Sequence, residues 1–244
     1  MNVSHGPLLD EALDAHGGID RWSKLQRADI HTLVGGIIWI VKGVPGILAD
    51  FHYEIELHAQ RGVFYNFMKP GQRATFQADR VAIETDDGAV VEELVNPRDS
   101  LKGQTLQSPW SILQLIYFAG YAMWTYVTTP FCFTMPGFAV EEIDPSRQGD
   151  ESLRRLKVTF PDYLARHSRE QIYYFGRDGL IRRNDYVGEA ISMESAAAHY
   201  IHDNKKFSGI TIGTRRRVYG LNPDGSYNLE PILVAIDVED VSFS

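Results

Sequence analysis

The stretch "LQLIYFAGYAMWTYVTTPFCF", residues 113–133, carries no charge and lies in a longer uncharged run between Lys102 and Glu141. A helix that is hydrophobic on every side either crosses a membrane or is buried in a protein core. Its tyrosines and tryptophan are spread through the segment, whereas a membrane span concentrates them at two interfaces. Gly120 and Pro130 also interrupt it. We therefore expect a buried helix over residues 109–127, and membrane contact is the less favoured alternative.

The sequence on both sides of this segment has the period of β-strands. In "FHYEIELH", residues 51–58, Phe51, Tyr53, Ile55 and Leu57 alternate with polar residues, which indicates a strand with one covered face. The turns Asp87-Gly88 and Asp178-Gly179 suit hairpins, because glycine accepts a positive φ. Further strands are predicted at about 30–41, 62–68, 72–77, 81–85, 90–95, 138–143, 153–160, 170–176, 179–188, 196–202, 210–219 and 232–243.

These elements predict an α+β fold that is mainly antiparallel β. A helical segment over residues 1–25 precedes the strands, with a break at Gly17-Gly18. A flat open sheet of so many strands is disfavoured by strand twist, so we expect a strongly curved sheet, or half-barrel, with the apolar helix in its concave face. No Pro/Ser-rich linker divides the chain, which predicts a single domain over residues 1–244.

Composition excludes several classes of function. The net charge of -8 disfavours nucleic acid, because binders of nucleic acid normally present a basic face. Cys132 is the only cysteine, so no intrachain disulfide or thiolate metal cluster can form. The acidic start, "MNVSHGPLLDEALDAHGG", does not have the pattern of a secretory signal, and the expected location is cytoplasmic. No sequence motif indicates a cofactor.

Several segments together resemble an uncharacterised bacterial family similar to the LolA/LolB half-barrels. They are "DAHGGIDRW", "YFAGYAMWTYVTTPF", "RRLKVTFP", "YYFGRDGLIRRNDY", "AAAHY" and "GTRRRVY", which together extend over nearly the whole chain. The resemblance implies a half-barrel closed by helices around an apolar cavity, a fold that carries acyl chains and other apolar ligands. We expect the chain to depart from the carriers, because its first residues do not have the pattern of a signal sequence and include no lipidation cysteine.

Aromatic and polar residues supply candidates for the lining of such a cavity. Tyr117, Tyr121 and Trp124 share one face of the helix by their spacing, and Trp39 is expected to complete the wall. Tyr173 and His199 are candidate polar contacts. The alternative is that the aromatic residues simply fill a core. His199 and His202 would point to opposite sides of a strand, so no metal site is expected.

Arginines recur on three predicted strands, at 154–155, 182–183 and 215–217. Alternation sends one member of an adjacent pair inward, and Arg155, Arg183 or Arg217 is the predicted anchor for an acidic head group. The alternative is an ion ladder across the strands, with Asp185 and Asp237 as carboxylate partners.

The preferred hypothesis is a soluble binding protein or carrier for an apolar or amphipathic small molecule, such as a lipid-like compound or an aromatic acid. The alternative is a cofactor-independent isomerase, cyclase, lyase or hydrolase in the same cavity, with His199 as general base. A third interpretation, an interaction module that exposes residues 109–138, is less favoured.

Overall fold

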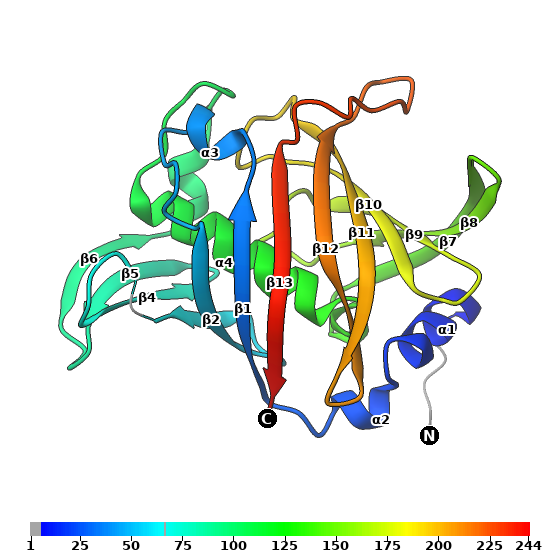
Figure 1. Ribbon diagram of the computed structural model, residues 1–244, viewed down its shortest axis with the longest axis horizontal. Coiled ribbons are helices and arrows are strands. Elements are labelled where there is room, and N and C mark those ends of the chain that lie inside the picture. The colour runs from blue at the N-terminus through cyan, green and yellow to red at the C-terminus, as the bar shows by residue number, and fades with distance from the viewer. Residues whose placement is uncertain (1–5, 66) are drawn as a thin grey trace.

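The computed structural model describes residues 6–65 and 67–244. Over these residues, thirteen strands form one antiparallel sheet in the order β6-β5-β4-β3-β2-β1-β13-β12-β11-β10-β9-β8-β7. Two meanders therefore meet where the last strand, β13, pairs with the first, β1. Figure 1 shows the sheet curving around the long helix α4, which passes behind β1, β13 and β12. The predicted mainly antiparallel, strongly curved sheet with a central helix is confirmed.

The elements follow one another in two blocks separated by α4. The first block holds α1 (Pro7–Ala15), α2 (Ile19–Trp22), β1 (Arg27–Gly35), α3 (Ile38–Val41), β2 (Asp50–Glu56), β3 (Arg61–Phe64), β4 (Gln72–Gln77), β5 (Arg80–Thr85), β6 (Val90–Val95) and the 3-10 helix η1 (Pro97–Leu101). After α4 (Ile112–Thr128) come the 3-10 helix η2 (Phe131–Thr134), β7 (Ala139–Gln148), β8 (Glu151–Thr159), β9 (Glu170–Phe175), β10 (Ile181–Val187), β11 (Ala196–Phe207), β12 (Ile210–Gly220) and β13 (Val234–Phe243).

Helix α4 is the centre of the core. Ser111 and Gln114 begin it with a capping box, in which each side chain bonds the backbone N–H of the other residue. Thr129 has extended backbone and precedes Pro130, which disfavours a further helical turn. Gly120 lets the helix approach β4, because a Cβ there would lie 2.4 Å from Cγ of Phe76. None of the helices in the described part of the chain has both the length and the apolarity needed to cross a membrane.

The strand pattern read from residues 51–58 is confirmed, since the four apolar side chains Phe51, Tyr53, Ile55 and Leu57 are all buried. The strand predicted over 30–41 requires correction, because β1 ends at Gly35 and the chain turns into α3. Gly36 permits this turn: its φ is 114°, and a Cβ there would lie 2.4 Å from the carbonyl oxygen of Leu233. The helical segment predicted over 1–25 forms α1 and α2, and its first five residues lie outside the described ones.

Candidate ligand-binding cavity

An apolar cavity of about 290 Å³ lies between α4 and the concave face of the sheet. Its walls come from α3 and α4, from the facing strands β10 to β13, and from β1 and β2. This volume is at the lower end of the roughly 300–1,000 Å³ that small-molecule sites occupy. The cavity therefore has room for one small ligand.

One face of α4 forms the inner wall of this cavity. Phe118, Ala122 and Tyr126 follow one another at a spacing of four residues, and Ala119 and Met123 lie beside them. Side chains four apart share a helix face, so these five form a continuous stripe. The two alanines leave space between the larger side chains, and that space is part of the cavity.

Two tyrosine hydroxyls of α4, one of them from a residue that lines the cavity, contact a buried histidine. The Tyr126 hydroxyl lies 2.8 Å from Nε2 of His167, and the Tyr121 hydroxyl lies 3.2 Å from its Nδ1. The Tyr186 ring stacks on His167 with centroids 4.0 Å apart. Burial lowers the pKa of His167 to about 3, so the imidazole is neutral at pH 7. One tyrosine therefore donates to the ring and the other accepts from it.

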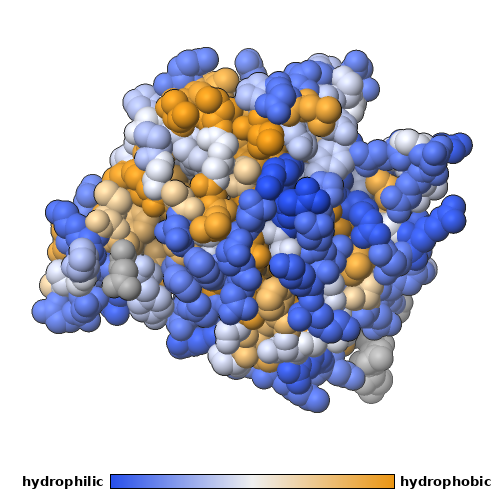
Figure 2. All heavy atoms as spheres, viewed as in Figure 1, coloured by the Kyte–Doolittle hydropathy of each residue, from blue (hydrophilic) through white to orange (hydrophobic). Residues whose placement is uncertain are grey.

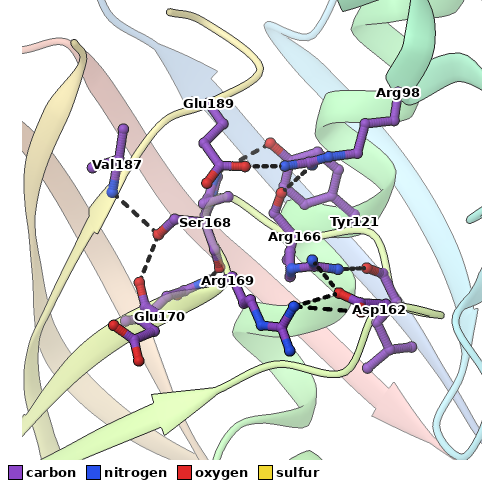
Figure 3. Close-up of polar contacts among 12 residues, drawn as sticks. Arg98, Tyr121, Asp162, Arg166, Ser168, Arg169, Glu170, Val187 and Glu189 are labelled. Carbon is purple, nitrogen blue, oxygen red and sulfur yellow. Dashed lines mark hydrogen bonds and ion pairs between the residues drawn. The ribbon is translucent and has the colours of Figure 1, made fainter. Parts of the chain in front are cut away.

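The loop that carries His167 is fastened on both sides (Figure 3). Arg98, from η1, donates through Nη1 to the carbonyl oxygen of Arg166 at 2.7 Å and forms an ion pair with Glu189. On the other side of His167, Ser168 donates to the Glu170 carbonyl and accepts from the Val187 N–H. These contacts hold the imidazole between α4 and β10.

The mouth of the cavity is bounded by two loops that Lys42 joins. Its Nζ donates to the carbonyl oxygens of Thr105 and Ile191, at 2.8 and 2.9 Å, and to that of Ser108 at 3.3 Å. Desolvation lowers the pKa of this buried amine to about 8. Ile191 lines the cavity. Leu106, which lies between Thr105 and Ser108 in the sequence, lines it as well. Figure 2 shows apolar residues gathered over neighbouring α3, where Ile40 is 64% exposed.

The predicted aromatic residues divide between this cavity and its surroundings. Trp39 lines the cavity and donates from Nε1 to the Gly35 carbonyl oxygen. Tyr121 and Trp124 are fully buried outside the lining, and Trp124 donates to the carbonyl oxygens of Glu56 and Ala59. Tyr117 lines a separate polar groove beside Arg98. The face of α4 that meets the cavity is therefore adjacent to the one predicted.

None of the three predicted arginines lines the cavity. Arg183 lies among tyrosines, 2.5 Å from Asp185 and 2.9 Å from the Tyr200 hydroxyl. Arg217 forms an ion pair with Asp237 across β12 and β13, and Arg155 donates to the Asp144 carbonyl oxygen at 2.6 Å. A bulge between Ile181 and Arg183 changes the alternation on which the assignment for β10 depended.

His199 and Tyr173 meet in a second, much smaller chamber behind Tyr126. Tyr173 donates there to Oε1 of Gln171 at 3.0 Å, and His199 has no solvent exposure. In residues 6–65 and 67–244, no group of three His, Cys, Asp or Glu side chains is arranged to hold a metal ion.

Sequence reasoning missed His167, Tyr186 and the Phe118-Ala122-Tyr126 stripe. The stripe has a recognisable signal, because alanines placed between aromatic residues at helical spacing leave space on that face. Arg216 was also missed, although it is in phase with the apolar Ile212 and Val218 along β12. His167 lies in a loop without periodicity, which gave no signal.

Comparison with solved structures identifies the class of fold. A LolA superfamily protein from Nitrosomonas europaea superposes with a TM-score of 0.51 at 9% identity, covering 99% of this chain and 94% of that one. A DUF1329 family protein from Desulfovibrio piger superposes with a TM-score of 0.53 at 14% sequence identity, and the match covers 97% of this chain and 92% of that protein. A domain named for outer membrane lipoprotein sorting, from Vibrio parahaemolyticus, superposes with a TM-score of 0.51 at 8% sequence identity, and the match covers 97% of this chain and 92% of that domain. No family model and no curated protein sequence matches the chain. The chain thus has a LolA-like fold.

Proposed function

We propose that the protein binds or carries one uncharged, largely apolar small molecule in the cavity between α4 and the sheet. The observation that carries this proposal is the lining itself, which is mostly aliphatic and aromatic with a few polar atoms. The LolA-like fold supports it, since the superfamily protein and the lipoprotein-sorting domain share the same architecture.

The polar groups of the lining argue for a neutral ligand over an acid. Over the described part of the chain, Glu194 is the one charged side chain of the lining, and it lies at the exposed mouth. A carboxylate ligand would meet no cationic side chain in this lining and would be repelled by Glu194, while the Lys42 ammonium at the mouth is already bonded to three carbonyl oxygens. Tyr126 and Tyr186 also line the cavity, and a tyrosine hydroxyl can hydrogen-bond a hydroxyl, ether or carbonyl group. His199, the base on which the enzyme alternative depended, lies outside this cavity.

A fluorescence titration tests the proposal. N-Phenyl-1-naphthylamine, an uncharged apolar dye, is titrated into the wild type, Ala122→Phe and Ala139→Phe. Ala122 faces the cavity, whereas Ala139 is exposed on β7 and controls for the added ring. We expect saturable binding to the wild type, displacement by dodecanol, and affinity at least about tenfold weaker for Ala122→Phe, because the ring occupies the ligand's space. Absent binding, or equal affinity in both variants, would overturn the proposal.

A further inference from the structure

The small chamber behind Tyr126 is distinct from the apolar cavity. It has a volume of about 20 Å³ and lies where the end of α4 meets β10, β11 and β12. Tyr126 lines both spaces and separates them. The apolar cavity presents mostly hydrocarbon, whereas this chamber is surrounded by polar side chains from four strands and from the residues that follow α1 and α4. They are His16, Thr129, Tyr173, Asn184, His199, Asn204, Thr211 and Arg216.

In the described part of the chain, the chamber has one formal positive charge and no compensating carboxylate. Arg216 is 6% exposed, and its Nε and Nη2 donate to the carbonyl oxygens of Gly213 and Tyr126, at 3.1 and 3.0 Å. Its guanidinium carbon also lies 5.0 Å from the ring centroid of Tyr126. These partners are neutral, and within residues 6–65 and 67–244 no Asp or Glu lines the chamber or forms an ion pair with Arg216. Buried charges in proteins are normally paired with an opposite charge.

His199 adds hydrogen-bonding capacity that no protein group satisfies. It has no solvent exposure, and neither Nδ1 nor Nε2 has a hydrogen-bond partner among the described residues. Burial and the nearby Arg216 hold its pKa well below the ordinary value, so the ring is neutral and carries one N–H. An unpaired buried N–H is costly, which indicates that the chamber holds an acceptor.

His16 does not supply that acceptor, because neither ring nitrogen of His199 has a hydrogen-bond partner among the described residues. Nδ1–H of His16 donates to the Ala12 carbonyl oxygen at 2.7 Å. Burial lowers its pKa to about 4, so it adds no charge at pH 7. The chamber thus keeps the net positive charge of Arg216.

We propose that this chamber binds one small monatomic anion, with chloride as the natural occupant, between the guanidinium of Arg216 and the N–H of His199. A volume of about 20 Å³ admits one or two water-sized species, which excludes sulfate, phosphate and organic acids. The anion neutralises Arg216 and accepts the hydrogen bond of His199. Arg216 bonds the carbonyl of Tyr126 in α4, so the anion connects His199 on β11 to a side chain that already joins β12 to α4.

Chloride bound only by the folded protein raises its thermal stability by mass action. Melting temperatures are measured in sodium chloride and in sodium gluconate at constant ionic strength, for the wild type, Arg216→Met and Arg217→Met. Arg217 pairs with Asp237 outside the chamber and serves as the matched control. We expect a saturable rise of about 3–5 °C in the wild type and in Arg217→Met at chloride tenfold above its dissociation constant, and none in Arg216→Met. A chloride response equal in all three proteins, or absent from the wild type, would overturn the proposal.

Anomalous diffraction from wild-type crystals soaked in sodium bromide provides a second measurement that does not depend on the folding of a variant. A bromine peak between Arg216 and His199 is the expected result. Ordered density without anomalous signal means that the chamber holds water, and the proposal then fails. Both measurements are made without an apolar ligand, so their outcome is independent of the binding function proposed above.

Discussion

The hydroxyl of Tyr126 lies 2.8 Å from Nε2 of His167, and this contact joins the wall of the apolar cavity to a loop between β8 and β9. The opposite ring nitrogen faces Tyr121, so one imidazole connects two turns of α4. The stack on Tyr186 extends the connection to β10. The position of the ligand wall therefore depends on a residue that does not itself line the cavity.

Replacing His167 by phenylalanine should destabilise the protein. The aromatic ring keeps the stack on Tyr186, but the hydroxyls of Tyr121 and Tyr126 lose their partners inside the core. We expect the free energy of unfolding to fall by about 2–4 kcal/mol in urea titrations, because each unsatisfied buried group costs roughly 1–3 kcal/mol. His52→Phe, at an exposed position on β2, should change it by less than about 0.5 kcal/mol. Equal effects of the two substitutions would show that the network contributes nothing.

Stability should fall as the pH drops below the pKa of an unfolded histidine. In the folded protein the pKa of His16 is lowered to about 4 and that of His167 to about 3, both by burial, from 6.5. As the pH falls, the histidines of the unfolded chain take up protons before those of the folded protein. The contribution of these histidines to stability is therefore fully present above pH 6.5 and is lost progressively as the pH falls from 6.5 toward the folded pKa values. Each histidine contributes a slope of about 1.4 kcal/mol per pH unit. Urea titrations between pH 7.5 and about 5 should show a slope that is smaller by about 1.4 kcal/mol per pH unit in His167→Phe, because one histidine no longer contributes. An unchanged slope would contradict a buried, neutral His167.

Adding one methyl group to α4 should disrupt its packing on the sheet. In Gly120→Ala the new Cβ would lie 2.4 Å from the ring of Phe76. Overpacking of this kind typically costs about 1–3 kcal/mol, which chemical denaturation would detect. Gly220→Ala is the matched control, because a Cβ there meets nothing within 4 Å. If Gly120→Ala is as stable as that control, α4 does not approach β4 as closely as described.

Lys42 should restrain the two loops at the mouth of the cavity. Lys42→Met keeps the length of the side chain but removes the three hydrogen bonds to the carbonyls of Thr105, Ser108 and Ile191. We expect amide hydrogen exchange near residues 105–108 and 191 to accelerate by more than about tenfold, because loss of these bonds favours local opening. Lys102→Met, at an exposed surface pair, should leave exchange there unchanged. If hydrogen-exchange protection of these residues is unaltered in Lys42→Met, Lys42 does not restrain the two loops.

The fold could be predicted from the sequence because its signals are local. Alternation fixed the inward face of residues 51–57, and the uncharged run identified α4. The site was less accessible, because a helix buried on all sides has several candidate faces and alternation fails at a bulge such as that before Arg183. His167 is placed by contacts between distant segments, which no local pattern encodes. The cytoplasmic location stays a prediction.

A crystal structure with bromododecanol, carrying bromine on its terminal carbon, tests the central claim most directly. We expect an anomalous bromine peak inside the apolar cavity, among Phe118, Met123 and Ala197. We also expect that Ala122→Phe removes this peak while the fold is retained. Bromine found only on the outer surface, or an unliganded cavity at saturating alcohol, would contradict the account.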